Sequence, residues 1–189
     1  MSPPAPHRLV LGTGNVHKVP EIAAVLAPDW EVVSHDLDVE ETGATFEVNA
    51  LLKARAVRDA TGEVAVADDS GIEIDALDGR PGIHSARWTD EQDWIPRVLR
   101  ELDGVPAARR TCRYVCAAAV ARPDGTEAVV RGEVEGRIAS EPRGTGGFGY
   151  DPIIEPLEGD GRTFGEMTVA EKQALSHRTR AFRALRALL

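Results

Sequence analysis

Residues 111–138 read TCRYVCAAAVARPDGTEAVVRGEVEGRI, and this stretch decides the fold class. Two segments that look like long strands, residues 111–121 and 127–138, lie on either side of the sequence PDG at residues 123–125, which is typical of a hairpin turn. Two strands that are joined by a tight turn run antiparallel. The chain is therefore expected to contain an antiparallel hairpin that a purely parallel sheet would lack.

Outside this hairpin, short apolar strands alternate with helical patterns. Strands are expected at residues 8–11, 30–34, 64–67 and 72–77, with DDSG (residues 68–71) at the end of the third. Helices are expected from residues 17–19 onward, over 46–60 behind the N-cap Thr45, over 94–102, and twice near the C-terminus, where Thr168 with Glu171 and then Ser176 provide caps and Phe182, Leu185 and Leu188 point inward. This order predicts an α/β protein with a mixed central sheet, flanking helices and an antiparallel hairpin insertion, not a strict doubly wound sheet.

Bulk composition limits the range of functions. The chain has 189 residues, 42% of them hydrophobic, which fits one domain over residues 1–189 with a real core. A formal charge of −9 argues against a nucleic-acid polymer as ligand, although a small polyanion needs only a local basic cluster. No apolar run approaches the roughly 20 residues that cross a bilayer. The start, MSPPAPHR, has no apolar segment of a signal peptide, so we expect a short frayed tail and a cytoplasmic protein.

The two cysteines, Cys112 and Cys116, lie four residues apart in an apolar run. In a strand this spacing places both on one face. No Cys or His at metal-ligand spacing accompanies them, so we expect reduced core residues and not a zinc site or a disulfide.

A glycine-rich stretch, GTGGFGYDP at residues 144–152, carries four glycines within six residues. Glycine lets the backbone approach a ligand closely, and Phe148 and Tyr150 can supply a flat apolar surface beside it. A loop of this kind suits a ligand with a charged part and a flat ring, which describes a nucleotide. The alternative is an ordinary glycine-rich surface hairpin.

Residues 13–18, TGNVHK, follow the first expected strand and open a helix. Backbone N–H groups at a helix N-terminus favour an anion, and Lys18 adds a full positive charge. The segment is not a Walker A loop, and His17 stands where a Rossmann fingerprint needs glycine. The alternative is a plain helix cap with a solvated lysine.

Two further polar clusters fall at the ends of expected elements. Glu40 and Glu41, together with Asp68 and Asp69, could bind Mg²⁺ beside a phosphate site and supply a general base, although adjacent aspartates also occur in simple turns. The other cluster joins Lys172 to Ser176, His177 and Arg178 at the C-terminal helices. Arg178 could donate hydrogen bonds to a phosphate or a carbonyl, whereas His177 alone is more often a surface residue of a helix.

Six blocks in one register resemble the inosine/xanthosine triphosphate pyrophosphatase family. They are TGNVHK (13–18), EETGATF (40–46), ADDSG (67–71), PGIHSAR (81–87), GTGGFGYDP (144–152), and EK with SHR (171–178). The resemblance implies one nucleotide pyrophosphatase domain with two lobes around a central cleft, in a protein that is typically a homodimer. It also implies Mg²⁺-dependent attack of water between the α and β phosphates of non-standard purine nucleoside triphosphates.

The resemblance assigns roles to individual residues. Asp69 matches the family's proposed proton acceptor, and Glu40 and Asp69 would hold magnesium. The substrate contacts would come from Thr13, Gly14, Asn15, Val16, His17 and Lys18 around the triphosphate, from Ser70, from Phe148, Gly149, Tyr150 and Asp151 around the nucleotide, and from Lys172, His177 and Arg178. Arg178 would donate to the C6 carbonyl of hypoxanthine or xanthine and would face the amino group of adenine, and leaving it unpaired costs about 1–3 kcal/mol.

Two segments depart from the family pattern. Residues 46–50 read FEVNA where the family usually has Phe-x-Glu-Asn-Ala, so Val48 leaves the capping box incomplete. Residues 88–94 are short, and Pro96 replaces a common asparagine, so we expect altered packing with activity retained. Three alternatives remain open: a pyrophosphatase of other modified or standard nucleotides, a nucleotide-binding sensor without turnover and, more distantly, a dinucleotide-dependent oxidoreductase.

Overall fold

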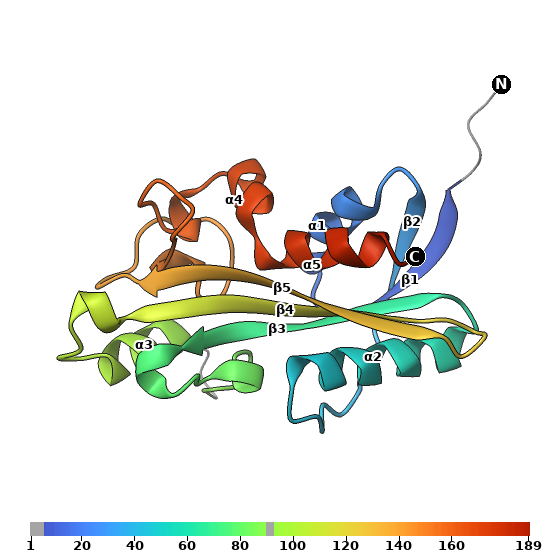
Figure 1. Cartoon of the computed structure of the whole chain (residues 1–189), viewed down its shortest axis with the longest axis horizontal. Coiled ribbons are helices and arrows are strands. Elements are labelled where there is room, and N and C mark those ends of the chain that lie inside the picture. The colour runs from blue at the N-terminus through green and yellow to red at the C-terminus, as the bar shows by residue number, and fades with distance from the viewer. Residues whose placement is uncertain (1–5, 90–92) are drawn as a thin grey trace. The chain divides into compact units, whose positions relative to one another are not determined.

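The computed structural model describes residues 6–89 and 93–189. The expected tail at residues 1–5 and part of the departure at residues 88–94 lie outside the described residues. A six-stranded sheet with the order β2-β1-β3-β4-β5-β6 runs through the protein (Figure 1). Strand β1 pairs in parallel with β2 and β3, whereas β6 pairs antiparallel with β5. The predicted α/β class with a mixed sheet is confirmed.

The helices and strands follow the predicted order closely. The strands are β1 (His7–Gly12), β2 (Trp30–His35), β3 (Ala65–Ile74), β4 (Thr111–Ala121), β5 (Glu127–Ile138) and β6 (Ile154–Pro156). The helices are α1 (Lys18–Leu26), α2 (Phe46–Thr61), α3 (Trp94–Glu101), α4 (Val169–Leu175) and α5 (His177–Arg186), and short 3-10 helices cover Asp75–Leu77, Gly82–His84, Ala107–Arg109, Asp151–Ile153 and Phe164–Glu166. None of the helices described is long and apolar enough to cross a membrane.

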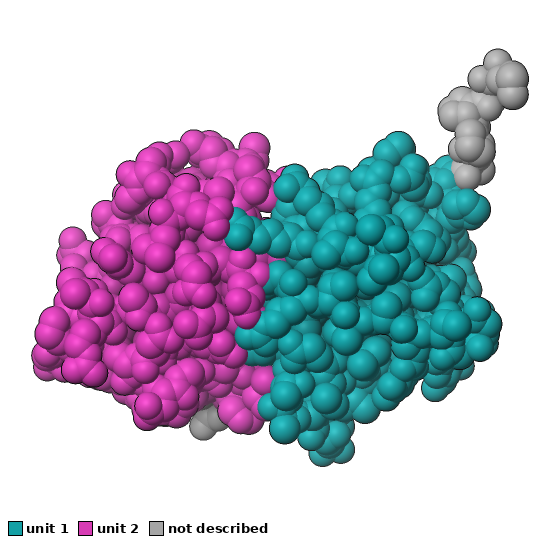
Figure 2. All heavy atoms as spheres, viewed as in Figure 1, with its two compact units in different colours: residues 1–69, 116–132, 178–189 teal, residues 70–115, 133–177 magenta. Residues whose placement is uncertain are grey.

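The chain divides into two compact units (Figure 2). Unit 1 comprises residues 1–69, 116–132 and 178–189, and unit 2 comprises residues 70–115 and 133–177. Strands β3, β4 and β5 each contribute residues to both units. The turn of the predicted hairpin is in unit 1, where the Arg122 amide donates to the Thr126 carbonyl at 2.9 Å and closes the connection between β4 and β5.

Alternation along β1 explains the two helical layers of unit 1. Leu9 and Leu11 are fully buried in one cluster with residues of α1 and α5, whereas Val10 packs with Val57 of α2 in another. Successive side chains of a strand point to opposite faces. Helices α1 and α5 therefore cover one face of the sheet in this unit and α2 covers the other (Figure 1).

Unit 2 has its own core. Buried apolar side chains from β3, α3, β4, β5 and the segment after β6 form one cluster, which includes Ile72, Val98, Tyr114, Val134 and Phe164. Both cysteines are buried and free, as expected: Cys112 belongs to this core and Cys116 to the core of unit 1.

Local capping confirms several predictions. The Thr45 hydroxyl accepts from the Val48 amide at 3.3 Å and caps α2, and Thr168 with Glu171 forms the predicted capping box of α4. Lys18 begins α1, which leaves Pro20 in the first turn, where a missing N–H costs nothing. The prediction that Leu188 points into the core is wrong. Its side chain is 47% exposed, because α5 ends at Arg186, two residues earlier.

A second prediction is also wrong. Residues 65–74 form one continuous strand, so Asp68 and Asp69 lie inside β3 and not in a loop at its end. Gly71 is needed in this strand because Ser85 and Gly82 lie too close for a side chain. A Cβ there would lie 2.4 Å from the Ser85 Oγ and 2.5 Å from the Gly82 carbonyl oxygen.

Candidate active site

The predicted anion loop, residues 13–18, connects β1 to α1 in unit 1. Its turn is held by side-chain acceptors: the Asn15 amide donates to the Thr13 Oγ1, and the His17 amide donates to the Asn15 Oδ1, each at 3.0 Å. Gly14 and His17 are exposed and Val16 is 74% exposed. The loop thus keeps an accessible surface at the N-terminus of α1, where an anion is favoured.

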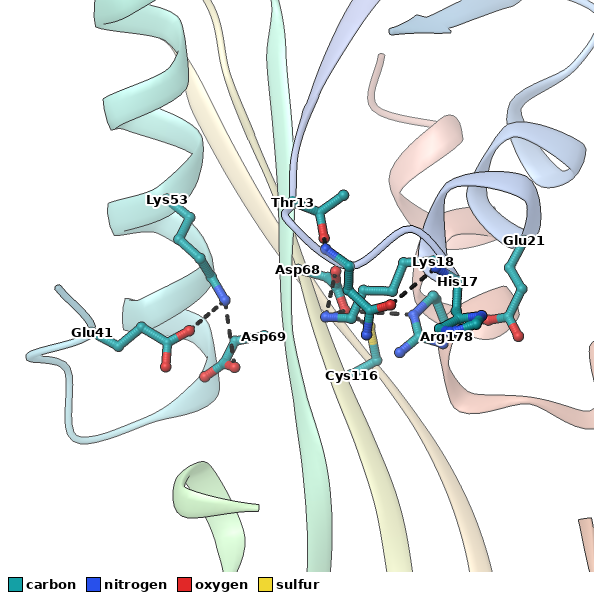
Figure 3. A network of polar contacts seen from close by, with 11 residues as sticks. Thr13, His17, Lys18, Glu21, Glu41, Lys53, Asp68, Asp69, Cys116 and Arg178 are labelled. Carbon is teal, nitrogen blue, oxygen red and sulfur yellow. Dashed lines mark hydrogen bonds and ion pairs between the residues drawn. The ribbon is translucent and has the colours of Figure 1, made fainter. Parts of the chain in front are cut away.

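Lys18 is anchored directly behind this loop. Its Nζ contacts both carboxylate oxygens of Asp68 at 3.0 Å (Figure 3). The Nε of Arg178 lies 3.5 Å from the Asp68 Oδ2, and the Cys116 thiol donates to the same oxygen at 3.7 Å. Burial by itself would raise the pKa of Asp68, but the positive charges of Lys18, Arg178 and Lys53 outweigh it, so this pKa lies well below its ordinary value. Asp68 is thus ionised at neutral pH and anchors these cations.

Arg178 is buried in unit 1 and is held by two carboxylates. Its Nη1 donates to the Glu21 Oε2 at 2.6 Å, and its Nε faces Asp68. Burial opposes its charge, yet Asp68 and Glu21 raise the pKa of the guanidinium above its ordinary value. The structure therefore places Arg178 beside the anchor of Lys18 (Figure 3).

Asp69, the predicted proton acceptor, has a different environment from its neighbour. Its Oδ2 accepts from the Asn49 Nδ2 at 3.1 Å, and its Oδ1 lies 3.5 Å from the Lys53 Nζ, which also contacts the Glu41 Oε1 at 2.7 Å (Figure 3). Burial raises the pKa of Asp69 and Glu41 adds to the rise, whereas Lys53 opposes it. Two adjacent carboxylates thus have pKa values shifted in opposite directions, a pattern typical of acid–base chemistry.

Glu40, the other predicted metal ligand, has an exposed side chain. The structure instead brings its neighbour Glu41 to Lys53 and so toward Asp69. Among the residues described, no group of three or more His, Cys, Asp or Glu side chains is placed to hold a metal ion.

The glycine-rich loop of unit 2 is organised around Asp151. Its Oδ2 accepts from the Phe148 amide at 2.7 Å and from the Lys172 Nζ at 2.8 Å, and the carboxylate is buried. Gly147 permits this arrangement: its φ is 71°, and a Cβ would lie 1.9 Å from the Asp151 Oδ2. The loop is therefore a folded structure and not a simple surface hairpin.

Aromatic and cationic side chains gather around this loop. The Lys172 Nζ lies 4.4 Å from the centre of the Phe148 ring, and the His177 ring stacks on the Tyr114 ring at 4.5 Å. The Tyr150 hydroxyl donates to the Ser85 carbonyl at 2.7 Å. Of the other predicted contacts, Gly149 is half-buried between Phe148 and Tyr150, and Ser70 follows Asp69 in β3.

The predicted residues thus form two groups, one in each unit. The group of unit 1 contains the loop at 13–18 with Asp69 and Arg178, and the group of unit 2 contains Ser70, residues 148–151, Lys172 and His177. Sequence reasoning named Glu41 and Asp68 only as members of the acidic cluster, and it missed four other side chains that hold these residues: Glu21, Asn49, Lys53 and Tyr114. A signal existed for Asn49 and Lys53, which lie four residues apart on one side of α2, so their side chains are neighbours.

Comparisons of the sequence with known proteins identify the family of this chain. A sequence model of the Ham1 family matches residues 9–188, so this chain belongs to the Ham1 family. The dITP/XTP pyrophosphatase of Symbiobacterium thermophilum is 53% identical over 180 residues, which cover 92% of this chain and 90% of that protein. The dITP/XTP pyrophosphatase of Streptomyces coelicolor is 49% identical and covers 94% of both chains.

Solved structures extend the agreement to the fold. The Staphylococcus aureus Ham1 protein superposes with a TM-score of 0.85 at 36% identity and covers 96% of this chain and 97% of its own. The nucleoside-triphosphatase / dITP/XTP pyrophosphatase from Mycobacterium abscessus superposes with a TM-score of 0.76 at 43% identity, with 96% and 98% covered.

Proposed function

We propose that this protein hydrolyses non-standard purine nucleoside triphosphates, dITP and XTP among them, to the nucleoside monophosphate and pyrophosphate. The observation that carries the proposal is the pair Asp68 and Asp69, adjacent in β3 with opposite pKa shifts, one of which anchors Lys18 of the anion loop. The names and high identities of the relatives support the same activity.

The anion loop binds the triphosphate in this proposal. The Lys18 ammonium and the positive end of the α1 dipole offset the negative charge of the phosphates. Asp68 holds Lys18 through both of its oxygens, and Glu21 and Asp68 hold Arg178 beside it. Pre-positioned cations stabilise charge that develops on phosphate oxygens in the transition state.

Asp69 acts as the general base on the attacking water. Burial and Glu41 raise its pKa, which makes the carboxylate a better proton acceptor than an exposed aspartate. Asn49 donates to one oxygen and fixes the orientation of the carboxylate. Lys53 compensates the charges of Glu41 and Asp69, so the two carboxylates stay close together without strong repulsion.

The donor set fits Mg²⁺. The Lys53 Nζ contacts Glu41 and Asp69 together, so the two carboxylates already share one cation. Mg²⁺ is commonly held by one or two carboxylates, with waters and substrate phosphates completing its shell. We propose Asp69 with Glu41 as its protein ligands, Glu41 in preference to the exposed Glu40, and when bound the ion would neutralise charge on the phosphates.

The purine would bind at the group of unit 2. The Phe148 ring offers a stacking surface with the Lys172 Nζ beside it. His177, which stacks on Tyr114 in the same unit, provides a second donor. A C6 carbonyl accepts from such donors, whereas the C6 amino group of adenine leaves them unpaired at about 1–3 kcal/mol each. Arg178, which the resemblance assigned to the C6 carbonyl, lies in unit 1 with its Nη1 on Glu21. We further propose a homodimer, as the family resemblance implies, and a cytoplasmic location, as the sequence led us to expect.

Hydrolysis in ¹⁸O-labelled water tests the reaction. With dITP as substrate, we expect a single ¹⁸O in dIMP or in pyrophosphate, since water enters at the bond between the α and β phosphates. Label in orthophosphate would mean that the γ phosphate is removed, which contradicts the proposal. Tight nucleotide binding without any labelled product would instead favour a sensor.

A further inference from the structure

Tyr114 lies in the middle of β4, buried with 6% of its surface exposed. Its ring stacks on His177 with centroids 4.5 Å apart and planes inclined by 15°. A second aromatic, Phe164, packs nearby at 5.9 Å. A buried tyrosine normally finds a partner for its hydroxyl, and here the Tyr114 hydroxyl donates to the Asp151 Oδ1 at 3.1 Å.

The two carboxylate oxygens of Asp151 accept hydrogen bonds from different donors. Oδ1 accepts from Tyr114, and Oδ2 accepts from the Phe148 amide and the Lys172 Nζ. Without the tyrosine hydroxyl, the carboxylate loses its contact on Oδ1, one of the three contacts that fix its rotation. Both contacts on Oδ2 would then weaken, and with them the position of Lys172 over the Phe148 ring.

We infer that Tyr114 is a positioning residue for the purine base: its hydroxyl fixes Asp151, and with it Lys172 and Phe148, while its ring fixes the plane of His177. This inference rests on the proposed function, because it concerns the side chains that are proposed to bind the base. One residue thereby controls both the donor and the stacking surface of the base site.

The surroundings of Tyr114 keep its hydroxyl protonated. Burial raises the pKa of Tyr114, and the charge and hydrogen bond of Asp151 raise it further, to well above its ordinary value. The hydroxyl therefore stays protonated and remains a donor. Because Tyr114 holds base-binding side chains and not Asp69, its loss should affect KM and base discrimination more than kcat.

Tyr114→Phe removes the hydroxyl and keeps the ring, whereas Tyr114→Leu removes both. With Tyr114→Phe we expect KM for dITP to rise by at most roughly 10- to 150-fold, the range if the whole loss of a hydrogen bond to a charged group appears in substrate binding, with kcat within about twofold of wild type. The preference for dITP over dATP should fall in parallel. The ring-proton NMR signals of His177 should change little in Tyr114→Phe and strongly in Tyr114→Leu.

Val98→Ala is the matched control, since Val98 is fully buried in the same core and lies on α3. It destabilises unit 2 without removing a contact of Asp151 or His177. An equal rise in KM in this variant at a matched loss of thermal stability would overturn the inference. So would a Tyr114→Phe enzyme with wild-type KM and discrimination.

Titration with IMP separates this inference from the proposed function. A dissociation constant for IMP that rises in Tyr114→Phe but not in Val98→Ala supports the role of Tyr114, even where wild-type protein shows no turnover and the proposed function fails. Equal dissociation constants for wild type and Tyr114→Phe overturn the inference, even where dITP is hydrolysed normally.

Discussion

Replacing Asp68 by Asn should destabilise the protein, whereas the same change at Asp69 should not. Asp68 is 1% exposed and holds Lys18 and Arg178. Removing one partner of a buried ion pair costs about 3–5 kcal/mol. Lys18 keeps some access to water and Arg178 keeps Glu21, so the lower end, about 3 kcal/mol, is expected. For a chain of this size, that loss lowers Tm by about 6–12 °C.

Asp69→Asn should change the stability in the opposite direction, because the pKa of Asp69 is raised in the folded protein. Its ionised form therefore weakens the fold at neutral pH, and the neutral amide removes that penalty. The amide oxygen of the variant can still accept from Asn49, and Lys53 keeps Glu41. We expect stability at pH 7 equal to or above that of wild type.

The pH dependence of Asp68 follows from its lowered pKa. The stabilisation is fully present above the unfolded value, about 3.9, and is lost as pH falls through the lower folded value. The difference in stability between wild type and Asp68→Asn should therefore be greatest near neutral pH and shrink below about pH 4.

Urea denaturation, followed by circular dichroism and tryptophan fluorescence from pH 7 to pH 3, measures these differences. Asp68→Ala and Asp69→Ala serve as a second pair of variants, which lack the side-chain amide that the Asn variants keep in place of the carboxylate. The reasoning is refuted if Asp68→Asn is as stable as wild type at pH 7, or if Asp69→Asn loses as much stability as Asp68→Asn.

Four further outcomes are expected. Asp69→Asn should lose at least about 100-fold in kcat, a typical contribution of a general base, while calorimetry finds dITP binding largely retained; a near-normal rate would remove Asp69 from the catalytic role. Lys53→Met should also slow turnover, because Glu41 and Asp69 then repel each other, and a wild-type rate in this variant would contradict the charge argument. Gly147→Ala should raise KM for dITP far more than it lowers kcat, since its Cβ would meet Asp151, and unchanged KM would contradict the loop geometry. EDTA should abolish turnover of dITP and excess Mg²⁺ should restore it, whereas full activity in EDTA would exclude a divalent metal.

Much of the fold could be predicted because its signals are local. The periodicity of β1 and α2, the caps at Thr45 and Thr168, and the turn at residues 123–125 each depend on neighbours in the sequence. The sequence of β3 misled because DDSG looks like a turn. In the structure Gly71 serves the close approach of Ser85 and Gly82, which come from a segment more than ten residues away.

For the candidate site, the sequence predicted the residues of the family blocks but not the partners that surround them. Family blocks pointed to the loop at residues 13–18, to Asp69 and to residues 148–151, and the structure describes their surroundings. The partners that tune them come from distant segments: Asp68 meets Lys18 fifty residues away, and Tyr114 meets Asp151 across 37 residues. A tyrosine within an apolar run looks like any core residue, so only its packing reveals a role.

The central claim is the release of pyrophosphate from non-standard purines, and a comparison of dITP, XTP, dGTP and dATP tests it most directly. With Mg²⁺ present, kcat/KM and product identity would be measured for each nucleotide. We predict pyrophosphate and monophosphate as the products, with dITP and XTP strongly preferred over dGTP and dATP. Equal rates on all four nucleotides, or release of orthophosphate in place of pyrophosphate, would contradict the account.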